Sequence, residues 1–332
     1  MRGALRKMKS TGVGWVHDSS VKPLTLKNRI MALITLFVLF FMTLLYMFLV
    51  PLCAYYTYTR QSVVGALLFF GVALSPFMAR RPWKALGETN GFEAWRRYFY
   101  LRVHKEARFT QSKNVLLCCV PHGLFPLTLP MLSSISNDIF PEFEGRIPRT
   151  AVATGLWWSP VLSPLLVWLG CIPARKEEMR HHLKHNTVIV LPDGIAGAFH
   201  SQRDEECVYV EQRKGFVKLA IEEGALLVPV YCFGHSQLYD VFPRHDSWLA
   251  RFSRRIQFSI IWFWGEPWCP PMPRRVPLLV AVGEGIQVMQ DSNPTRECIE
   301  KVHTLFKQQL GTMYLKHRDQ VPGYENKELI IL

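Results

Sequence analysis

An uncharged apolar run near the start of the chain constrains its fold more than any other feature. Residues 30–50 carry no charge, and as a helix they would extend roughly 31 Å, enough to cross a bilayer. A second uncharged run, residues 63–78, would form about 24 Å of helix. Basic residues precede the first run and follow the second, and tyrosines lie between them. We therefore expect a membrane hairpin over residues 29–79, with both flanks cytosolic, a turn from Pro51 to Arg60, and a second arm that spans or dips.

Charge and cysteine content narrow the remaining classes. The 332-residue chain has a net charge of +13, which suits a nucleic acid, a membrane surface or a phosphorylated ligand. The apolar runs favour the membrane over nucleic acid. The eight cysteines form no C-x-x-C pair, so a disulfide framework is not expected and a reducing compartment is.

The chain divides into four predicted parts. Residues 1–28 form a basic cytosolic tail, 29–79 the hairpin, 80–112 an amphipathic connector and 113–332 a globular domain. Within the connector, the spacing of Phe92, Trp95, Phe99 and Val103 predicts one helix over 90–109. That helix would lie in the membrane interface or pack on the domain.

Alternating segments in the globular part predict an α/β fold. Residues 114–120, 149–154, 187–191 and 226–233 have the composition of buried strands, and 158–169, 176–184 and 214–223 that of helices. This order indicates a mostly parallel sheet flanked by helices. Functional loops in such sheets gather at the carboxyl ends of the strands, where His122, Asp193 and Gly234 all lie.

A histidine on a tight turn is the first candidate for chemistry. The sequence Val120-Pro121-His122-Gly123 ends a predicted strand. Pro121 fixes φ, and Gly123 lets the backbone approach a substrate closely. Because histidine can accept a hydroxyl proton near neutral pH, His122 is the candidate general base. A histidine satisfied inside its own turn is the alternative.

Two further segments carry candidate site residues, the first a partner for His122 and the second an anion-binding site. Pro192-Asp193-Gly194 follows a strand, and its carboxylate could orient the imidazole or stabilise its charged form; an ordinary turn is the alternative. The helix beginning near Arg213 and Lys214 could bind phosphate with its cations and free amides, or could simply be solvated. The remaining candidates for substrate binding there are Gly215, Phe216 and Lys218.

Other patterns carry less information. Gly234-His235-Ser236 resembles an esterase elbow, but Leu238 replaces the final glycine of that motif. His181 and His185 share a helix face among basic residues, which indicates a solvated surface rather than a metal site. Aromatic residues from Trp248 to 264 form either a membrane-surface element, which we favour, or a core helix.

Taken together, these segments resemble the type-2 diacylglycerol acyltransferase family, in order from about residue 90 to the C-terminus. Pro121-His122-Gly123 matches the family's His-Pro-His-Gly block, and Pro192-Asp193-Gly194 fits its Pro-Gly-Gly loop. The most specific stretches are 213–220 and 227–234. Arg175-Lys176 and the closing residues 328–332 also match.

The chain departs from the family pattern at three positions and from the pattern of wider glycerolipid acyltransferases at a fourth. Val120 stands where members carry His or Glu, so that position supplies no acid or base here. Asp193 replaces a glycine, and Gly197 stands where the loop usually holds Glu. Leu127 occupies the Asp position of the His-x4-Asp pattern that wider glycerolipid acyltransferases use. Asp193 is therefore the predicted charge partner of His122.

The resemblance implies transfer of a fatty acyl group from acyl-CoA to diacylglycerol, which yields triacylglycerol. His122 would deprotonate the acceptor hydroxyl, and backbone amides near Gly123 or Gly194 would stabilise the oxyanion. Acyl-CoA is then a substrate, and no cofactor or metal is expected. Monoacylglycerol, a long-chain alcohol or a sterol remain alternative acceptors, and a non-catalytic lipid-binding protein is the alternative from another class.

The resemblance also implies partners and a location. Acyl-CoA, a lipid alcohol and the bilayer are the expected partners, nucleic acid is not expected, and a homo-oligomer is left open. The expected location is the endoplasmic reticulum membrane, with the catalytic domain in the cytosol, and the lipid droplet is a further candidate.

Overall fold

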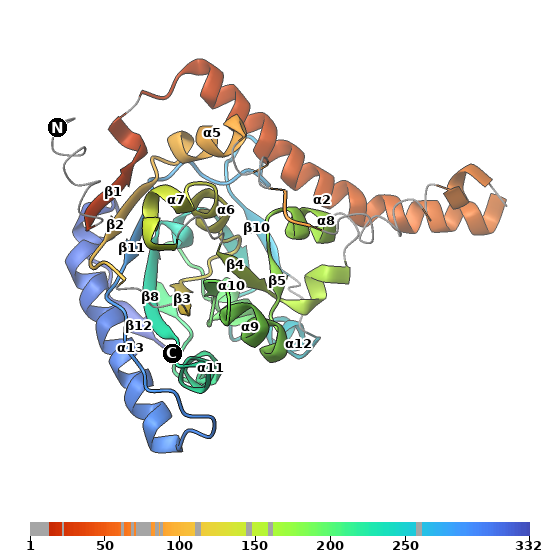
Figure 1. Cartoon of the computed structure of the whole chain (residues 1–332). Coiled ribbons are helices and arrows are strands. Elements are labelled where there is room, and N and C mark those ends of the chain that lie inside the picture. The colour runs from red at the N-terminus through yellow and green to blue at the C-terminus, as the bar shows by residue number, and fades with distance from the viewer. Residues whose placement is uncertain are drawn as a thin grey trace.

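A central eight-stranded sheet organises the chain (Figure 1). The computed structural model describes residues 13–21, 23–60, 63–67, 70, 81–83, 86, 89–109, 114–143, 148–158, 162–256 and 261–332. In spatial order the strands are β1 (Gly14–Asp18), β2 (Arg102–Lys105), β11 (Leu279–Val282), β8 (Leu226–Phe233), β3 (Val115–Val120), β6 (Val188–Val190), β4 (Arg149–Val152) and β5 (Ile172–Pro173).

The sheet is mostly parallel, as predicted. The five strands from β8 to β5 all run in one direction. β11 pairs antiparallel with β8 and parallel with β2, and β1 pairs antiparallel with β2. Each of the four strands predicted from the sequence is present, because short apolar segments bounded by turn residues can bury both faces in such a sheet.

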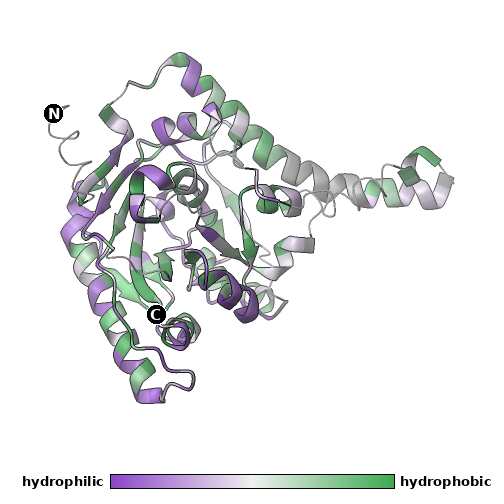
Figure 2. Ribbon diagram, in the orientation of Figure 1, coloured by the Kyte–Doolittle hydropathy of each residue, from purple (hydrophilic) through white to green (hydrophobic). Residues whose placement is uncertain are grey.

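Helices cover both faces, and β3 lies at the centre of the resulting core. Every β3 side chain is buried. Leu117 and Cys119 contribute to the core under α2 (Leu26–Arg60), α5 (Asn90–Tyr98), α6 (Thr128–Ser133) and α7 (Ser136–Ile139). Leu116 and Cys118 contribute to the core under α9 (Lys176–Leu183), α11 (Gly215–Glu223) and α13 (Arg296–His317). In Figure 2, green and purple alternate along α13, as expected for a helix with one buried face.

The remaining elements are short. Besides short 3-10 helices, they include α8 (Leu162–Trp168), α10 (Gly194–Phe199) and α12 (Trp248–Ile256), together with two small two-stranded sheets. One of these sheets pairs β9 (Asp240–Phe242) with β10 (Trp262–Trp264), and the other pairs β7 (Glu206–Val208) with β12 (Leu329–Ile331).

The predicted helix over 90–109 is only half correct. α5 ends at Tyr98, and residues 102–105 form β2 instead of continuing the helix. Leu101, Val103 and Lys105 are buried and alternate with partly exposed residues, which is the two-residue period of a strand. The main sheet therefore includes residues of the predicted tail and connector, and it begins well before residue 113.

The N-terminal apolar run forms a helix, but the predicted turn is wrong. α2 continues through Pro51 to Arg60 instead of turning there. Residues 63–67 are helical, and most of the predicted second arm, residues 68–69 and 71–78, lies outside the described part of the chain. In the described residues, no helix combines the length and the apolar character needed to cross a membrane.

One side of α2 packs on the domain. Ala32, Leu36 and Phe40 are buried in the core, and Trp95 Nε1 of α5 donates to Thr35 Oγ1 at 2.7 Å. Figure 1 shows α2 lying beside α5 and then extending away from the domain. Other apolar side chains of α2, including Phe37, are exposed.

Candidate active site

Three parallel strands bring the site together at their carboxyl ends. His122 follows β3, Asp193 follows the neighbouring β6, and His235 follows β8 on the other side of β3. Because these strands are parallel and adjacent, loops far apart in the sequence meet at one edge of the sheet. The predicted proximity of His122 and Asp193 is therefore present in the structure.

The His122 ring is held in one tautomer. Its Nδ1 lies 2.7 Å from the carbonyl oxygen of Gly123. Because a carbonyl can only accept a hydrogen bond, Nδ1 carries the proton and Nε2 carries the lone pair. Within the described residues Nε2 makes no hydrogen bond, and the side chain is half-buried. This nitrogen can therefore accept a proton from an incoming hydroxyl.

Asp193 contacts the backbone of His122 rather than its ring. The His122 N–H donates to Asp193 Oδ2 at 2.7 Å, while the ring is oriented by Gly123 instead. Asp193 is completely buried, and its Oδ1 has no hydrogen-bond partner in the described part of the chain. Burial raises the pKa of this carboxyl from 3.8 to about 6, and the nearby His122 opposes the rise. A carboxylate in such a poorly solvated position interacts strongly with any charge that forms beside it.

Gly197 provides the space that Asp193 occupies. It lies four residues beyond Asp193, one turn along α10, so the two positions share a helix face. A Cβ at residue 197 would lie 2.6 Å from Asp193 Cγ and closer still to Oδ2. A carboxylate at 193 and a side chain at 197 therefore exclude each other in this conformation.

A buried histidine supports the loop from behind. His235 Nδ1 lies 2.9 Å from the carbonyl oxygen of Pro121, so Nδ1–H donates, and Nε2 accepts from the Thr128 hydroxyl at 3.0 Å. Complete burial lowers the pKa of His235 to about 4, so the ring is neutral at pH 7. Neither His235 nor Thr128 was predicted as a site residue. The available signal was the position of His235 at the end of a buried strand.

The loop glycines differ in what their amides can do. Gly123 has φ +63°, and a Cβ there would lie 3.0 Å from the Cβ of His235. Among the described residues the Gly123 N–H has no acceptor, whereas the Gly194 N–H donates to Leu191 O at 3.2 Å. Of the two predicted oxyanion donors, Gly123 is therefore the one with a free amide.

The predicted phosphate-binding residues lie apart from this cluster. Lys214 forms an ion pair with Glu300 of α13, and Arg213 stacks over the Tyr209 ring at 5.3 Å. Lys218 is 3.9 Å from Glu222, and Phe216 is buried against Phe306. A Cβ at Gly215 would meet nothing within 4 Å, so space is open at the start of α11. No described contact joins these residues to His122.

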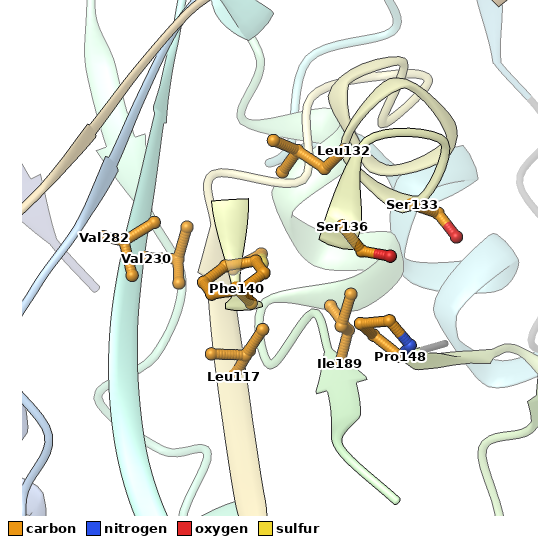
Figure 3. A pocket seen from close by; sticks show the side chains of 10 residues that line it. Leu117, Leu132, Ser133, Ser136, Phe140, Pro148, Ile189, Val230 and Val282 are labelled. Carbon is orange, nitrogen blue, oxygen red and sulfur yellow. The ribbon is translucent and has the colours of Figure 1, made fainter. Parts of the chain in front are cut away.

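Other candidates have structural roles. The Ser236 hydroxyl donates to the buried Glu206 at 2.7 Å, which removes it as a nucleophile. His181 is exposed on α9, and His185 is exposed just beyond the end of that helix at Leu183, so both are solvated as predicted although they do not share one helix. An apolar pocket beside β3 is lined by Leu117, Phe140 and Val230 among others (Figure 3). It has room for about one water molecule, so in this conformation it cannot hold an acyl chain.

Comparison with known proteins identifies the family. The sequence model for diacylglycerol acyltransferase matches residues 55–332, a range that includes every residue of the cluster around His122. The chain belongs to the diacylglycerol acyltransferase family. The resemblance seen in the sequence is therefore confirmed.

Relatives in this family differ in their named acceptors. The chain is 29% identical to human 2-acylglycerol O-acyltransferase 3 over 68% of its length and 71% of that protein. It is 28% identical to human diacylglycerol O-acyltransferase 2, over 68% of this chain and 62% of that protein. It is 27% identical to human acyl-CoA wax alcohol acyltransferase 2, over 71% of this chain and 75% of that protein. Family membership thus leaves the acceptor open.

One solved structure is also similar. The 1-acyl-sn-glycerophosphate acyltransferase PlsC from Thermotoga maritima matches 80% of this chain and 96% of its own, with 12% identity and a TM-score of 0.39. That likeness is too distant to bear on the fold or the site.

Proposed function

We propose that this chain is an acyl-CoA-dependent O-acyltransferase that makes triacylglycerol from diacylglycerol and fatty acyl-CoA, with His122 as general base. The observation that carries the proposal is the His122 ring itself. Its Nδ1–H is engaged by Gly123, and its Nε2 is left to accept a proton. A histidine buried only to support the fold would be expected to use both nitrogens within the protein, as His235 does.

The reaction follows from this arrangement. Nε2 of His122 removes the acceptor's hydroxyl proton as the oxygen attacks the thioester carbonyl carbon of acyl-CoA. The tetrahedral intermediate carries its negative charge on the former carbonyl oxygen, which the Gly123 N–H can stabilise. As the C–S bond breaks, the imidazolium returns the proton to the departing CoA thiolate. The products are an ester and CoA, and His122 is regenerated neutral.

Asp193 contributes through charge and position. Its carboxylate fixes the His122 backbone through the 2.7 Å hydrogen bond. Its negative charge also favours the imidazolium that forms during the reaction, because the site is buried and weakly screened. It is therefore a positioning and electrostatic residue, not a proton carrier.

The start of α11 is the proposed acyl-CoA phosphate site. Arg213 is exposed, and the ion pair of Lys214 with Glu300 joins two partly exposed side chains, so it can open for an anion. The first turn of α11 also has unsatisfied amides. Because α11 precedes the parallel strand β8, its N-terminus lies at the same end of the sheet as His122.

We place the protein at the endoplasmic reticulum membrane, with lipid droplets as a second location. The exposed apolar face of α2 supports attachment to a membrane, as does an aromatic surface on α12 and β10 that includes Trp248, Phe252 and Trp262, while the choice of this membrane comes from the family resemblance. Trp248 is 71% exposed, and Arg251 lies exposed on the same helix. Aromatic and basic side chains together are typical of the membrane interface.

The test is an acyl-transfer assay on microsomes that contain the protein. Labelled acyl-CoA is supplied with diacylglycerol, monoacylglycerol, a long-chain alcohol or a sterol, and the labelled ester identifies the acceptor. His122→Ala should reduce transfer at least about 100-fold. His181→Ala, a change of an exposed histidine on α9, is the matched control and should retain full activity.

Three results would contradict the proposal. Activity above roughly a tenth of wild type in His122→Ala would show that His122 is not the base. A preference for another acceptor would correct the substrate and keep the mechanism. No transfer to any acceptor by membranes with folded wild-type protein would favour a non-catalytic lipid-binding role.

A further inference from the structure

A cluster of two histidines and one glutamate lies away from the proposed active site. It joins His104 of β2, Glu106 just after β2, and His317 at the end of α13. Figure 1 shows the end of α13 reaching β1 and β2. β2 is separated from β3 by β11 and β8, so this cluster is independent of the His122 site.

The donor atoms of the three residues converge. One ligand atom from each lies within 4.8 Å of the other two. His317 Nε2 and Glu106 Oε1 are 3.2 Å apart, which is close to the separation of two ligands on one tetrahedral zinc ion. The rings of His104 and His317 have centroids 4.7 Å apart and are tilted by 52°, so they do not block each other.

One of the histidines has an unused nitrogen inside the protein. His104 Nδ1 is buried and makes no hydrogen bond to any described residue. An imidazole nitrogen that makes no hydrogen bond in the described residues is available as a ligand. Glu106 Oε1 is close to two donors, His317 Nε2 at 3.2 Å and Lys316 Nζ at 2.9 Å, so its lone pairs are directed into the cluster.

The other contacts in the cluster are compatible with a metal ion. Gln320 Nε2 lies 3.3 Å from His317 Nδ1. If a metal took Nε2, Nδ1 would carry the proton, and the Gln320 amide nitrogen, which also donates to Lys316 O at 3.4 Å, would have to turn away from Nδ1. Lys316 Nζ lies 2.9 Å from Glu106 Oε1, so the carboxylate already attracts a cation. The Lys316 side chain is 55% exposed and can withdraw into solvent.

We propose that His104, Glu106 and His317 form a zinc site that fastens the end of α13 to β2. Two imidazoles and one carboxylate are ligands that zinc accepts, and a water would complete the tetrahedron. Glu106 and His317 are 211 residues apart in sequence, so one ion would connect distant parts of the chain. The Glu106 backbone is already fixed, since its N–H donates to Val282 O at 2.9 Å.

The test measures zinc binding by the purified full-length chain in detergent. Protein stripped with a chelator is dialysed against zinc, metal content is measured by mass spectrometry, and affinity by competition with a chromophoric chelator. Wild type should bind one zinc per chain. Glu106→Gln keeps the shape of the side chain but loses the charge, so it should bind at least about 100-fold more weakly. Lys316→Gln removes the competing ammonium and should bind more tightly.

A control variant separates this site from adventitious surface binding. Cys298→Ser combined with His181→Ala and His185→Ala removes exposed zinc ligands elsewhere and should bind zinc like wild type. Circular dichroism without metal checks that all variants fold. The proposal is overturned if folded wild type binds no stoichiometric zinc, if folded Glu106→Gln keeps wild-type affinity, or if the control variant loses the metal.

Discussion

Changing Asp193 to Asn tests how much stability the protein gives up to keep a carboxylate beside His122. The side chain is fully buried, and burial raises its pKa from 3.8 to about 6. The folded state therefore binds this proton more tightly than the unfolded state does. The stability associated with the protonated carboxyl is complete below pH 3.8 and is lost as pH rises through about 6.

The size of the effect follows from that rise in pKa. At about 1.4 kcal/mol per pH unit, keeping the carboxylate ionised costs about 3 kcal/mol of folding free energy at pH 7.5. Asn has nearly the same shape and can accept the His122 N–H, but it does not ionise. The stability of the Asp193→Asn variant minus that of wild type should therefore rise by about 2.5 kcal/mol between pH 4 and pH 7.5, since a small part of the effect is already present at pH 4. An unpartnered amide at the Oδ1 position adds a constant that does not depend on pH.

The assay is urea denaturation of both proteins in detergent at several pH values, followed by tryptophan fluorescence. The measured quantity is the difference between the two plots of unfolding free energy against pH. Other groups also titrate: His235 and His104 have pKa values lowered to about 4, so they make both proteins less stable as pH falls. These contributions cancel in the difference. Acyl transfer by the variant should fall even where its stability rises, since the charge that favours the imidazolium is gone.

A flat difference curve, or one that falls with rising pH, would refute this reasoning. It would mean that Asp193 is not held ionised at a cost, and that its role is limited to shape. Unchanged acyl transfer in the variant would separately remove the electrostatic part of the mechanism.

Three further changes test other parts of the site. Thr128→Val removes the hydroxyl that donates to the buried histidine behind the loop, and urea titration should show a loss of about 1–3 kcal/mol with a lower kcat. Gly197→Ala alone should strongly destabilise the protein, but it should do so much less when combined with Asp193→Gly. A double-mutant cycle should therefore give a coupling free energy of at least about 1 kcal/mol, and additive effects would contradict the steric argument. Replacing Arg213 and Lys214 with Ala should raise the KM for acyl-CoA on the order of tenfold or more and leave the KM for the acceptor unchanged. Equal changes in both KM values would assign these cations to the fold or the membrane surface.

Four strands of the central sheet could be predicted because each is a short apolar segment bounded by turn residues, a pattern that is local in the sequence. A segment such as Val115–Val120 is apolar on both faces and ends in Pro and Gly, which only a buried parallel strand accommodates well. Residues 99–105 were harder, because Phe99 and Val103 fit the period of the preceding helix. The deciding fact is that β2 pairs with both β1 and β11, which no local pattern contains.

The path of α2 shows the same limit. Pro51 and the tyrosines after it predicted a turn, yet the helix continues to Arg60. A proline removes one hydrogen bond from a helix, and the rest of a long ladder can remain intact. Hydroxyls of Thr57 and Thr59 donate to the carbonyls four residues earlier, at 2.7 and 2.8 Å, within the helical part that follows.

The site was predictable in its location but not in its contacts. Parallel strands placed His122 and Asp193 at one edge, and the structure brings them together. That Asp193 would bind the backbone and Gly123 the ring depends on loop geometry that no sequence pattern specifies. His235 was missed because a buried neutral histidine has the same sequence signal as any polar residue at a strand end.

The two departures from the family pattern in the α10 loop become one feature in the structure. Taken separately, a missing glutamate at 197 suggests a lost partner for His122, and an aspartate at 193 suggests an altered turn. In three dimensions the Asp193 carboxylate occupies the space that a side chain at Gly197 would need, one helical turn away. The loop therefore still supplies one buried carboxylate beside His122, anchored from a different position. Because the Asp193 carboxylate fits only where residue 197 has no side chain, the two departures form one compatible pair, which argues that the site has kept its carboxylate.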